Sequence, residues 1–190
     1  MTVPHVAAVF LAILLAGCSG LGAGGDDVPS TWDLREDPTV DVVGWPEDDE
    51  GRSRTIRDVP DDLEVLLPEE TRLAVGAWEP ERVEVARLFE PGARAVTSIG
   101  VVLPPAPPPD TLQRAAELAE QLELDDAAIR EWGARPTREG GSVTSPPRDL
   151  SGPRGDWSIQ LTLLPGGDAD DPHARLTVLL VSRNAADADR

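Results

Sequence analysis

The sequence predicts an α+β fold: a mostly antiparallel sheet of about five strands, covered on one face by one or two helices. Two observations predict it. Segments of alternating apolar and polar residues lie on both sides of an amphipathic helical segment, in the order strands, helix, strands. Turn signals rich in Gly, Pro and Asp separate these segments. The length of 190 residues is enough for one such domain with some additional chain.

Three strands open the predicted domain. Arg72–Trp78 alternates enough for a short strand, and residues 83–89 alternate with period two. That period places four residues on one face: Val83, Val85, Arg87 and Phe89. A turn at Pro91-Gly92 then leads to Ala95–Leu103, whose β-branched residues predict a partner strand.

A helix follows a run of prolines. Residues 104–109 hold five prolines, which end the preceding strand and in polyproline II form are also typical of SH3 ligands. Asp110 is a suitable N-cap, with Gln113 completing a capping-box pattern. Residues 111–122 place apolar side chains at helical spacing.

A second short helix is predicted over Ala127–Trp132, capped by Asp125 or Asp126 and stopped by Gly133. The two helical segments together look like a DNA-binding helix-turn-helix. A recognition helix presents Arg, Lys, Gln or Asn to the groove, whereas here Arg130 stands among acidic residues. We therefore expect the apolar positions of these helices to pack in the core.

The best hairpin candidate lies near the C-terminus. Trp157–Leu164 and Ala174–Arg183 both alternate and indicate two paired strands. Residues 135–154 before them, rich in Gly, Pro, Ser and Arg, are expected to form a flexible loop, and 184–190 a disordered tail. The folded domain is therefore expected over 71–183.

The segment 18–70 is interpreted as an acidic flexible tether. Residues 26–70 hold 16 acidic residues and 4 Arg, a net charge of -12. Such a segment gains little apolar burial to offset its ordering entropy, and its charges extend it. The cluster Glu47-Asp48-Asp49-Glu50 offers oxygen ligands for calcium but lacks the EF-hand spacing. Trp32 and Trp45 either dock on the domain or touch the membrane interface.

The composition excludes several functions. The chain has 35 acidic and 17 basic residues, a formal net charge of -18. A surface this acidic repels phosphate, so we expect no nucleic-acid partner. The single cysteine, Cys18, makes no internal disulfide, and only His5 and His173 can serve as imidazole bases or ligands.

The first residues have the pattern of an export signal. Residues 1–17 contain no charged side chain, and every residue from Val6 to Ala16 is apolar. This run is shorter than the about 20 residues that span a bilayer, but it matches the apolar region of a signal peptide. It ends in Leu15-Ala16-Gly17-Cys18, which resembles the lipobox of bacterial lipoproteins.

The lipobox resemblance implies a processed and lipidated chain. Signal peptidase II would cut between Gly17 and Cys18, and the sulfur of Cys18 would carry diacylglycerol with fatty acyl chains such as palmitate. Two acyl chains anchor durably, because each buried methylene contributes about 0.8 kcal/mol. The resemblance therefore implies a protein anchored by lipid to the extracytoplasmic face of the cell membrane.

Residues 58–183 are loosely similar to actinobacterial secreted or lipid-anchored proteins of unknown function. The similarity lies in the pattern of Pro, acidic residues and Leu in Val59-Pro60-Asp61-Asp62-Leu63 and Leu67-Pro68-Glu69-Glu70-Thr71. It implies a location outside the cytoplasm and no particular activity.

One cluster in the predicted domain has metal-ligand chemistry. The hairpin loop brings together carboxylates and an imidazole that suit a divalent ion, at Asp168, Asp170, Asp171 and His173. The same composition is typical of a solvated turn, so we expect no metal and no cofactor. The sequence has no Gly-x-Ser-x-Gly elbow and no Lys for a phosphate-binding loop, so we expect no enzyme.

These observations together predict an envelope lipoprotein with a non-enzymatic binding or scaffolding domain. The expected partners are the membrane, through Cys18, and an envelope protein. Trp78, Trp132 and Trp157 are candidate partner-contact residues, unless they pack in the core. Two alternatives stay open: a carrier of an apolar ligand between sheet and helix, and an envelope hydrolase with paired carboxylates.

Overall fold

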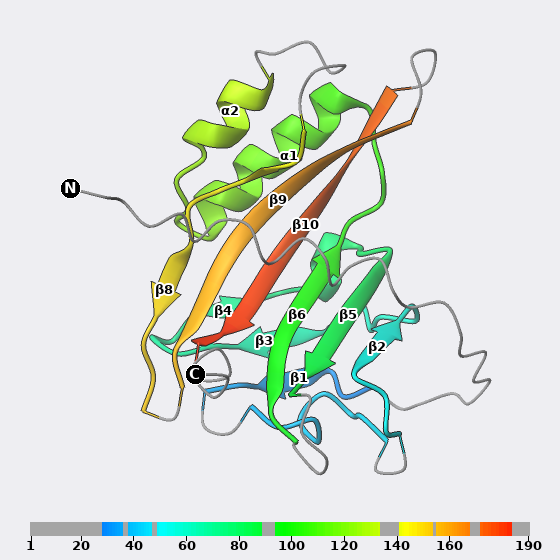
Figure 1. Ribbon diagram of the computed structural model, residues 1–190, viewed down its shortest axis with the longest axis vertical. Coiled ribbons are helices and arrows are strands. Elements are labelled where there is room, and N and C mark those ends of the chain that lie inside the picture. The colour runs from blue at the N-terminus through cyan, green and yellow to red at the C-terminus, as the bar shows by residue number, and fades with distance from the viewer. Residues whose placement is uncertain are drawn as a thin grey trace.

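The computed structural model describes residues 28–35, 38–46, 49–88, 94–133, 141–153, 155–167 and 172–183. Within them the chain forms a seven-stranded antiparallel sheet, a three-stranded sheet and two α-helices, which confirms the α+β class. Figure 1 shows the helices α1 (Pro108–Gln121) and α2 (Ala127–Gly133) beside one half of the large sheet, with the small sheet beside its other half.

The large sheet has the spatial order β2-β5-β6-β10-β9-β7, and β8 also pairs with β9. The bounds of its strands are β2 (Ser53–Ile56), β5 (Arg82–Arg87), β6 (Val96–Val102), β7 (Val143–Thr144), β8 (Arg148–Leu150), β9 (Trp157–Gly167) and β10 (Pro172–Ser182). The last strand in sequence, β10, lies between β6 and β9 near the middle of this sheet (Figure 1). The predicted strands at 83–89 and 95–103 correspond to β5 and β6 and are confirmed, although Phe89 lies outside the described residues.

The predicted C-terminal hairpin is confirmed and is longer than expected. β9 and β10 pair over eleven residue pairs, from Trp157–Ser182 to Gly167–Pro172. Pairing continues through Pro165, which lies opposite Ala174. The backbone N–H and C=O of Ala174 bond to Ala106 on its other side, at 2.9 and 3.1 Å. Pro165 therefore occupies a non-hydrogen-bonded position, where its missing N–H costs nothing.

The period-two pattern of this hairpin places one face of the sheet against the helices and the small sheet. Alternate side chains of β9 and β10 are almost fully buried: Trp157, Ile159, Leu161, Leu163, Ala174, Leu176, Val178 and Leu180. They share a single core cluster with Ala115 and Leu118 of α1 and with Ile129 of α2. Because that cluster accounts for the apolar helix positions, packing explains the helix-turn-helix pattern.

The described part of 18–70 is folded, so its interpretation as a tether is wrong from Val28 onward. This segment supplies β2 of the large sheet. It also supplies β1 (Thr31–Asp33) and β3 (Glu64–Leu66) of the small sheet, where β1 pairs parallel with β3 and β3 pairs antiparallel with β4 (Arg72–Leu73). The predicted boundary at residue 71 therefore falls inside the domain.

Apolar side chains spaced between the acidic residues explain this folding. Ten of them are at most 8 % exposed: Trp32, Leu34, Val40, Val43, Trp45, Ile56, Leu63, Val65, Leu66 and Leu67. The average charge of the segment hides this pattern, because the described carboxylates are exposed or half-exposed while these apolar side chains face the core. Trp32 and Trp45 are 0 % and 3 % exposed, so both belong to the domain core.

Arg87 of β5 holds part of this segment against the large sheet. Its guanidinium lies 5.1 Å from the centroid of the Trp45 ring. Its Nε donates to the carbonyl of Gly51 at 2.7 Å and its Nη2 to that of Asp49 at 2.8 Å. One cation thus fixes a loop through two carbonyls and an aromatic face, a geometry that the planar guanidinium suits.

The start of α1 differs from the prediction. Asp110 is not the N-cap: the helix begins at Pro108, with Pro107 in the capping position and no side-chain cap. Proline suits the first helical positions, because its fixed φ is helical and the absent N–H is not needed there. Asp110 lies inside the first turn, and Gln113 bonds to Glu117 at 3.1 Å instead of completing a capping box.

The second predicted helix is confirmed as α2. The backbone N–H of Ala127 donates to Asp125 Oδ1 at 2.9 Å, so Asp125 is the carboxylate that caps it. Two other expectations fail. The predicted strand at 72–78 is only β4 followed by the 3-10 helix η2 (Gly76–Trp78). The predicted loop at 135–154 contains β7 and β8, because β9 offers them an edge to pair with.

Several predictions concern residues outside the described part of the chain. They are the signal peptide 1–17, the lipidated Cys18 and the tail 184–190. Where the structure describes the chain, neither helix has the length and apolar character needed to cross a membrane.

We expect the substitution Trp32→Ala to lower the free energy of unfolding by about 3–5 kcal/mol, because it empties a fully buried site in the shared core. Guanidinium denaturation followed by circular dichroism measures this. Asp58→Ala, at an exposed position of the same segment, is the matched control and is expected to change stability by less than about 0.5 kcal/mol. Equal, small effects of both substitutions would contradict a folded N-terminal segment.

Candidate functional site

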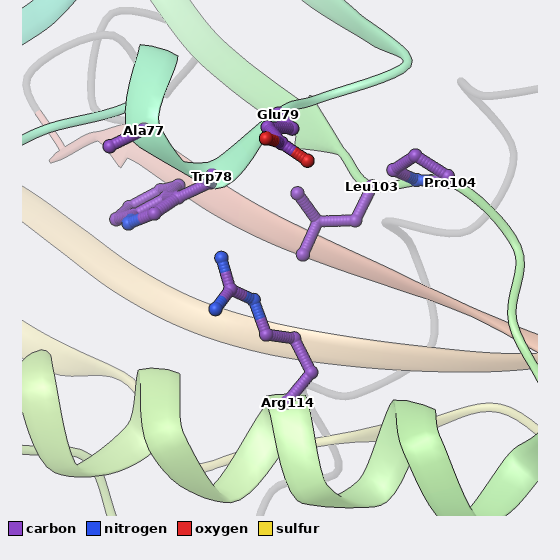
Figure 2. Close-up of a pocket in the computed structure, with 6 residues that line it drawn as sticks. All are labelled: Ala77, Trp78, Glu79, Leu103, Pro104 and Arg114. Atoms are coloured by element: carbon purple, nitrogen blue, oxygen red, sulfur yellow. The ribbon is translucent and has the colours of Figure 1, made fainter.

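A groove opens between η2 and α1, with a volume of about 370 Å³. Six residues from three separate segments line it: Ala77, Trp78, Glu79, Leu103, Pro104 and Arg114. Figure 2 shows the side chain of Arg114 rising from α1 toward Trp78 and Leu103, with Glu79 beside Leu103. Four of the six lining residues are therefore apolar, and the other two supply one cation and one carboxylate.

Gly76 fixes the wall of the groove that η2 forms. Its N–H donates to the carbonyl of Leu63 at 3.0 Å. A Cβ at this position would lie 2.3 Å from the carbonyl oxygen of Asp61 and 2.4 Å from that of Pro60. Because these neighbours are backbone atoms, no larger residue fits without a shift of the 60–61 segment. The close approach sets the position of Trp78, two residues later.

Glu79 ends η2 with an unusual backbone. Its φ is 51° and ψ is 55°, the left-handed region, and its N–H donates to the Gly76 carbonyl at 3.0 Å. A residue other than glycine in this region costs of order 1–3 kcal/mol. The side chain is exposed, while Trp78 before it is only 8 % exposed. The chain thus turns sharply between a buried indole and a solvent-facing carboxylate.

The segment after β6 supplies the apolar floor. Leu103 is 4 % exposed, and its N–H donates to the carbonyl of Leu176 at 2.9 Å. Ala106, three residues on, forms an isolated bridge with Ala174. These bonds to β10 hold Leu103 and the exposed Pro104 in place beneath the groove.

Arg114 comes from α1, which is fastened to the same strand. The buried hydroxyl of Thr111 donates to the carbonyls of Ala106 at 3.1 Å and Pro107 at 3.2 Å. Since Thr111 and Ala115 face the core, Arg114 lies at the helix edge with its side chain 39 % exposed. Its contact with Glu117 is long, with 3.4 Å between Nη1 and Oε2. A pair this exposed contributes little and yields easily to another anion.

Neighbouring charges at the start of β5 and on β10 form ion pairs, although Glu81 Oε2 and Arg175 Nε are buried without a hydrogen bond. Arg82 pairs with Glu81 at 2.8 Å and Glu84 at 2.7 Å, and Arg175 pairs with Glu81 at 3.4 Å. Burial alone would lower the pKa of Arg82, but the hydrogen bond and charge of Glu84, together with those of Glu81, outweigh it and raise that pKa. None of these paired residues lines the groove, where the charged side chains are Glu79 and Arg114.

The predicted partner-contact residues are mostly core residues. Trp157 and Trp132 are 0 % and 3 % exposed, so their assignment as partner contacts is wrong. Trp78 is also largely buried but lines the groove. Glu79 and Arg114 were not predicted from the sequence. The available signal was Gly76 and Pro80 on either side of Trp78, which break a strand pattern.

The hairpin-loop residues with metal-ligand chemistry, for which we expected no metal, are only partly described. Asp168, Asp170 and Asp171 lie outside the described residues, and His173 lies on β10 opposite Gly166. Within the described ranges, no group of three or more His, Cys, Asp or Glu side chains is placed to hold a metal ion. In the acidic cluster at 47–50, Asp49 Oδ1 accepts a bond from the N–H of Gly51 at 2.7 Å, and Glu47 and Asp48 are not described.

Comparison of the chain with models of protein families, with curated proteins and with solved structures finds no match.

We expect Gly76→Ala to lower the free energy of unfolding by about 1–3 kcal/mol, because its Cβ would overlap the backbone at 60–61. Gly141→Ala is the matched control: among the described residues, nothing lies within 4 Å of the place that its Cβ would take, so we expect a change below about 0.5 kcal/mol. Thermal unfolding of the two variants and the wild type measures the difference. Similar unfolding temperatures for all three would contradict the close approach.

Proposed function

We propose that this protein is a lipoprotein, anchored by diacylglycerol on Cys18 to the extracytoplasmic face of the cell membrane, and that its α+β domain is a non-enzymatic binding module. The single observation that carries the anchor is Leu15-Ala16-Gly17-Cys18 at the end of an eleven-residue apolar run. A thiol at this position takes a thioether-linked lipid, and small residues before it suit a protease groove at the membrane surface.

The position at which the folded domain begins limits how far the domain lies from the lipid on Cys18. Val28 already packs against the core, so nine residues, 19–27, separate it from Cys18. Whatever path they follow, they span at most about 35 Å. The domain is therefore held close to the bilayer, and its partner is expected at or near the membrane surface.

The groove between η2 and α1 supports a binding role. Its lining offers an indole, a leucine, a guanidinium and a carboxylate, which are groups that recognise a ligand by shape and charge. None of the six lining residues is a Ser, Cys, His or Lys, and Glu79 is a single carboxylate without the facing partner that glycoside hydrolysis uses. Binding is the activity that these side chains perform directly.

We expect Cys18→Ser to abolish lipidation, since a hydroxyl does not accept the thioether-linked diacylglycerol. The variant is expected to leave the detergent phase in detergent partitioning or to accumulate as an unprocessed precursor. Mass spectrometry of the N-terminus distinguishes these forms. Ser19→Ala, the neighbouring substitution, is the control and is expected to remain lipidated at Cys18.

A wild-type protein that keeps residues 1–17 with an unmodified thiol would contradict the proposed anchor. So would a Cys18→Ser variant that partitions into detergent like the wild type.

A further inference from the structure

We infer that the groove binds a free α-amino acid with an apolar side chain, recognised as a zwitterion by Arg114 and Glu79. The inference rests on the binding role proposed above and specifies its ligand, but it does not depend on the lipid anchor. Three features of the groove lead to it: its cation, its carboxylate and its apolar lining.

Arg114 is the group that takes the ligand carboxylate. A guanidinium offers parallel N–H donors that match a carboxylate in bidentate geometry. Figure 2 shows this guanidinium pointing across the groove toward Trp78 and Leu103, away from the body of its own helix. The 3.4 Å contact with Glu117 is the ion pair that an incoming carboxylate would displace.

Glu79 is the group that takes the ligand ammonium. Its carboxylate stands at the end of η2 in a left-handed conformation, on the opposite wall from Arg114. A chain with a net charge of -18 also repels bare anions, so a ligand that carries its own positive charge is favoured.

The apolar lining and the size of the groove define the rest of the ligand. The largely buried side chains of Trp78 and Leu103 lie where the guanidinium points, and the exposed residues Ala77 and Pro104 add further apolar surface. A volume of about 370 Å³ lies at the lower end of the range for small-molecule sites. An amino acid with an aliphatic side chain fits these dimensions and places its two charges at one end.

Three related probes test the inference by isothermal titration of the purified, lipidated chain in detergent. L-leucine carries both charges, L-leucinamide lacks the carboxylate, and N-acetyl-L-leucine lacks the ammonium. At about pH 6 the amine of leucinamide stays protonated. We expect leucine to bind at least about tenfold more tightly than either derivative, because each loses a charge-assisted contact.

Two substitutions test which side chain binds the carboxylate of the ligand and which binds its ammonium group. Arg114→Gln is expected to remove the preference for leucine over leucinamide but to keep the preference over N-acetyl-leucine. Glu79→Gln is expected to remove the preference for leucine over N-acetyl-leucine but to keep the preference over leucinamide. Arg130→Gln, at an Arg that is 71 % exposed on α2 and pairs with Asp126, is the matched control and is expected to leave all three affinities unchanged.

Glu79→Gly tests ligand binding separately from the stability of the fold. Glycine adopts the left-handed conformation without strain, so this variant is expected to unfold at the same or a higher temperature than the wild type. It is nevertheless expected to lose the preference for leucine over N-acetyl-leucine.

The inference would be overturned if wild-type protein gave no heat of binding with about 10 mM leucine, or bound all three probes equally. It would also be overturned if Arg114→Gln lowered the affinity for all three probes by the same factor. If a chain with unmodified Cys18 bound leucine, the proposed lipid anchor would be refuted but the proposed ligand would not. If a lipidated chain did not bind leucine, the proposed ligand would be refuted but the anchor would not.

Discussion

The fold depends on the burial of apolar side chains that are scattered through the most acidic part of the chain. Trp32, Leu34 and Trp45 enter the same core as the central strands, although the segment between residues 26 and 70 carries a net charge of -12. Fully burying a large apolar side chain contributes about 1.5–3 kcal/mol, whereas exposed charges some distance apart are largely screened at physiological salt. Burial therefore outweighs repulsion, and the small sheet covers the face of the large sheet that the helices leave open (Figure 1).

The sequence predicts the large elements well because period and turn chemistry are local. The β5–β6 pair, the β9–β10 hairpin and both helices follow from alternation, helical spacing and Gly or Pro signals. The short strands β1, β3 and β7 were not predictable in this way. Each has two or three residues, too few to display a period, and each forms because a distant strand offers an edge. The acidic segment was misread because net charge averages over residues that face opposite directions.

The candidate site was even less predictable from the sequence than the short strands. Its lining comes from η2, the residues after β6 and one position of α1, which lie up to 37 residues apart in the chain. Arg114 has no distinguishing neighbour in the sequence, and it matters only because Thr111 and Ala115 turn the other faces of the helix toward the core. Trp78 was identified by residue type, but its environment depends on the contact of Gly76 with the backbone at 60–61. Such a site emerges from packing, which a single sequence does not display.

The place of the final strand bears on how the chain acquires its structure. β10 (Pro172–Ser182) follows both helices and β9 in the chain and supplies a pairing edge to both β6 and β9. While these residues are still being synthesised, β6 has no neighbour on that side, and the core faces that β10 would cover stay hydrated. The middle of the large sheet therefore forms only after β10, which lies far along the chain from β6, has been made.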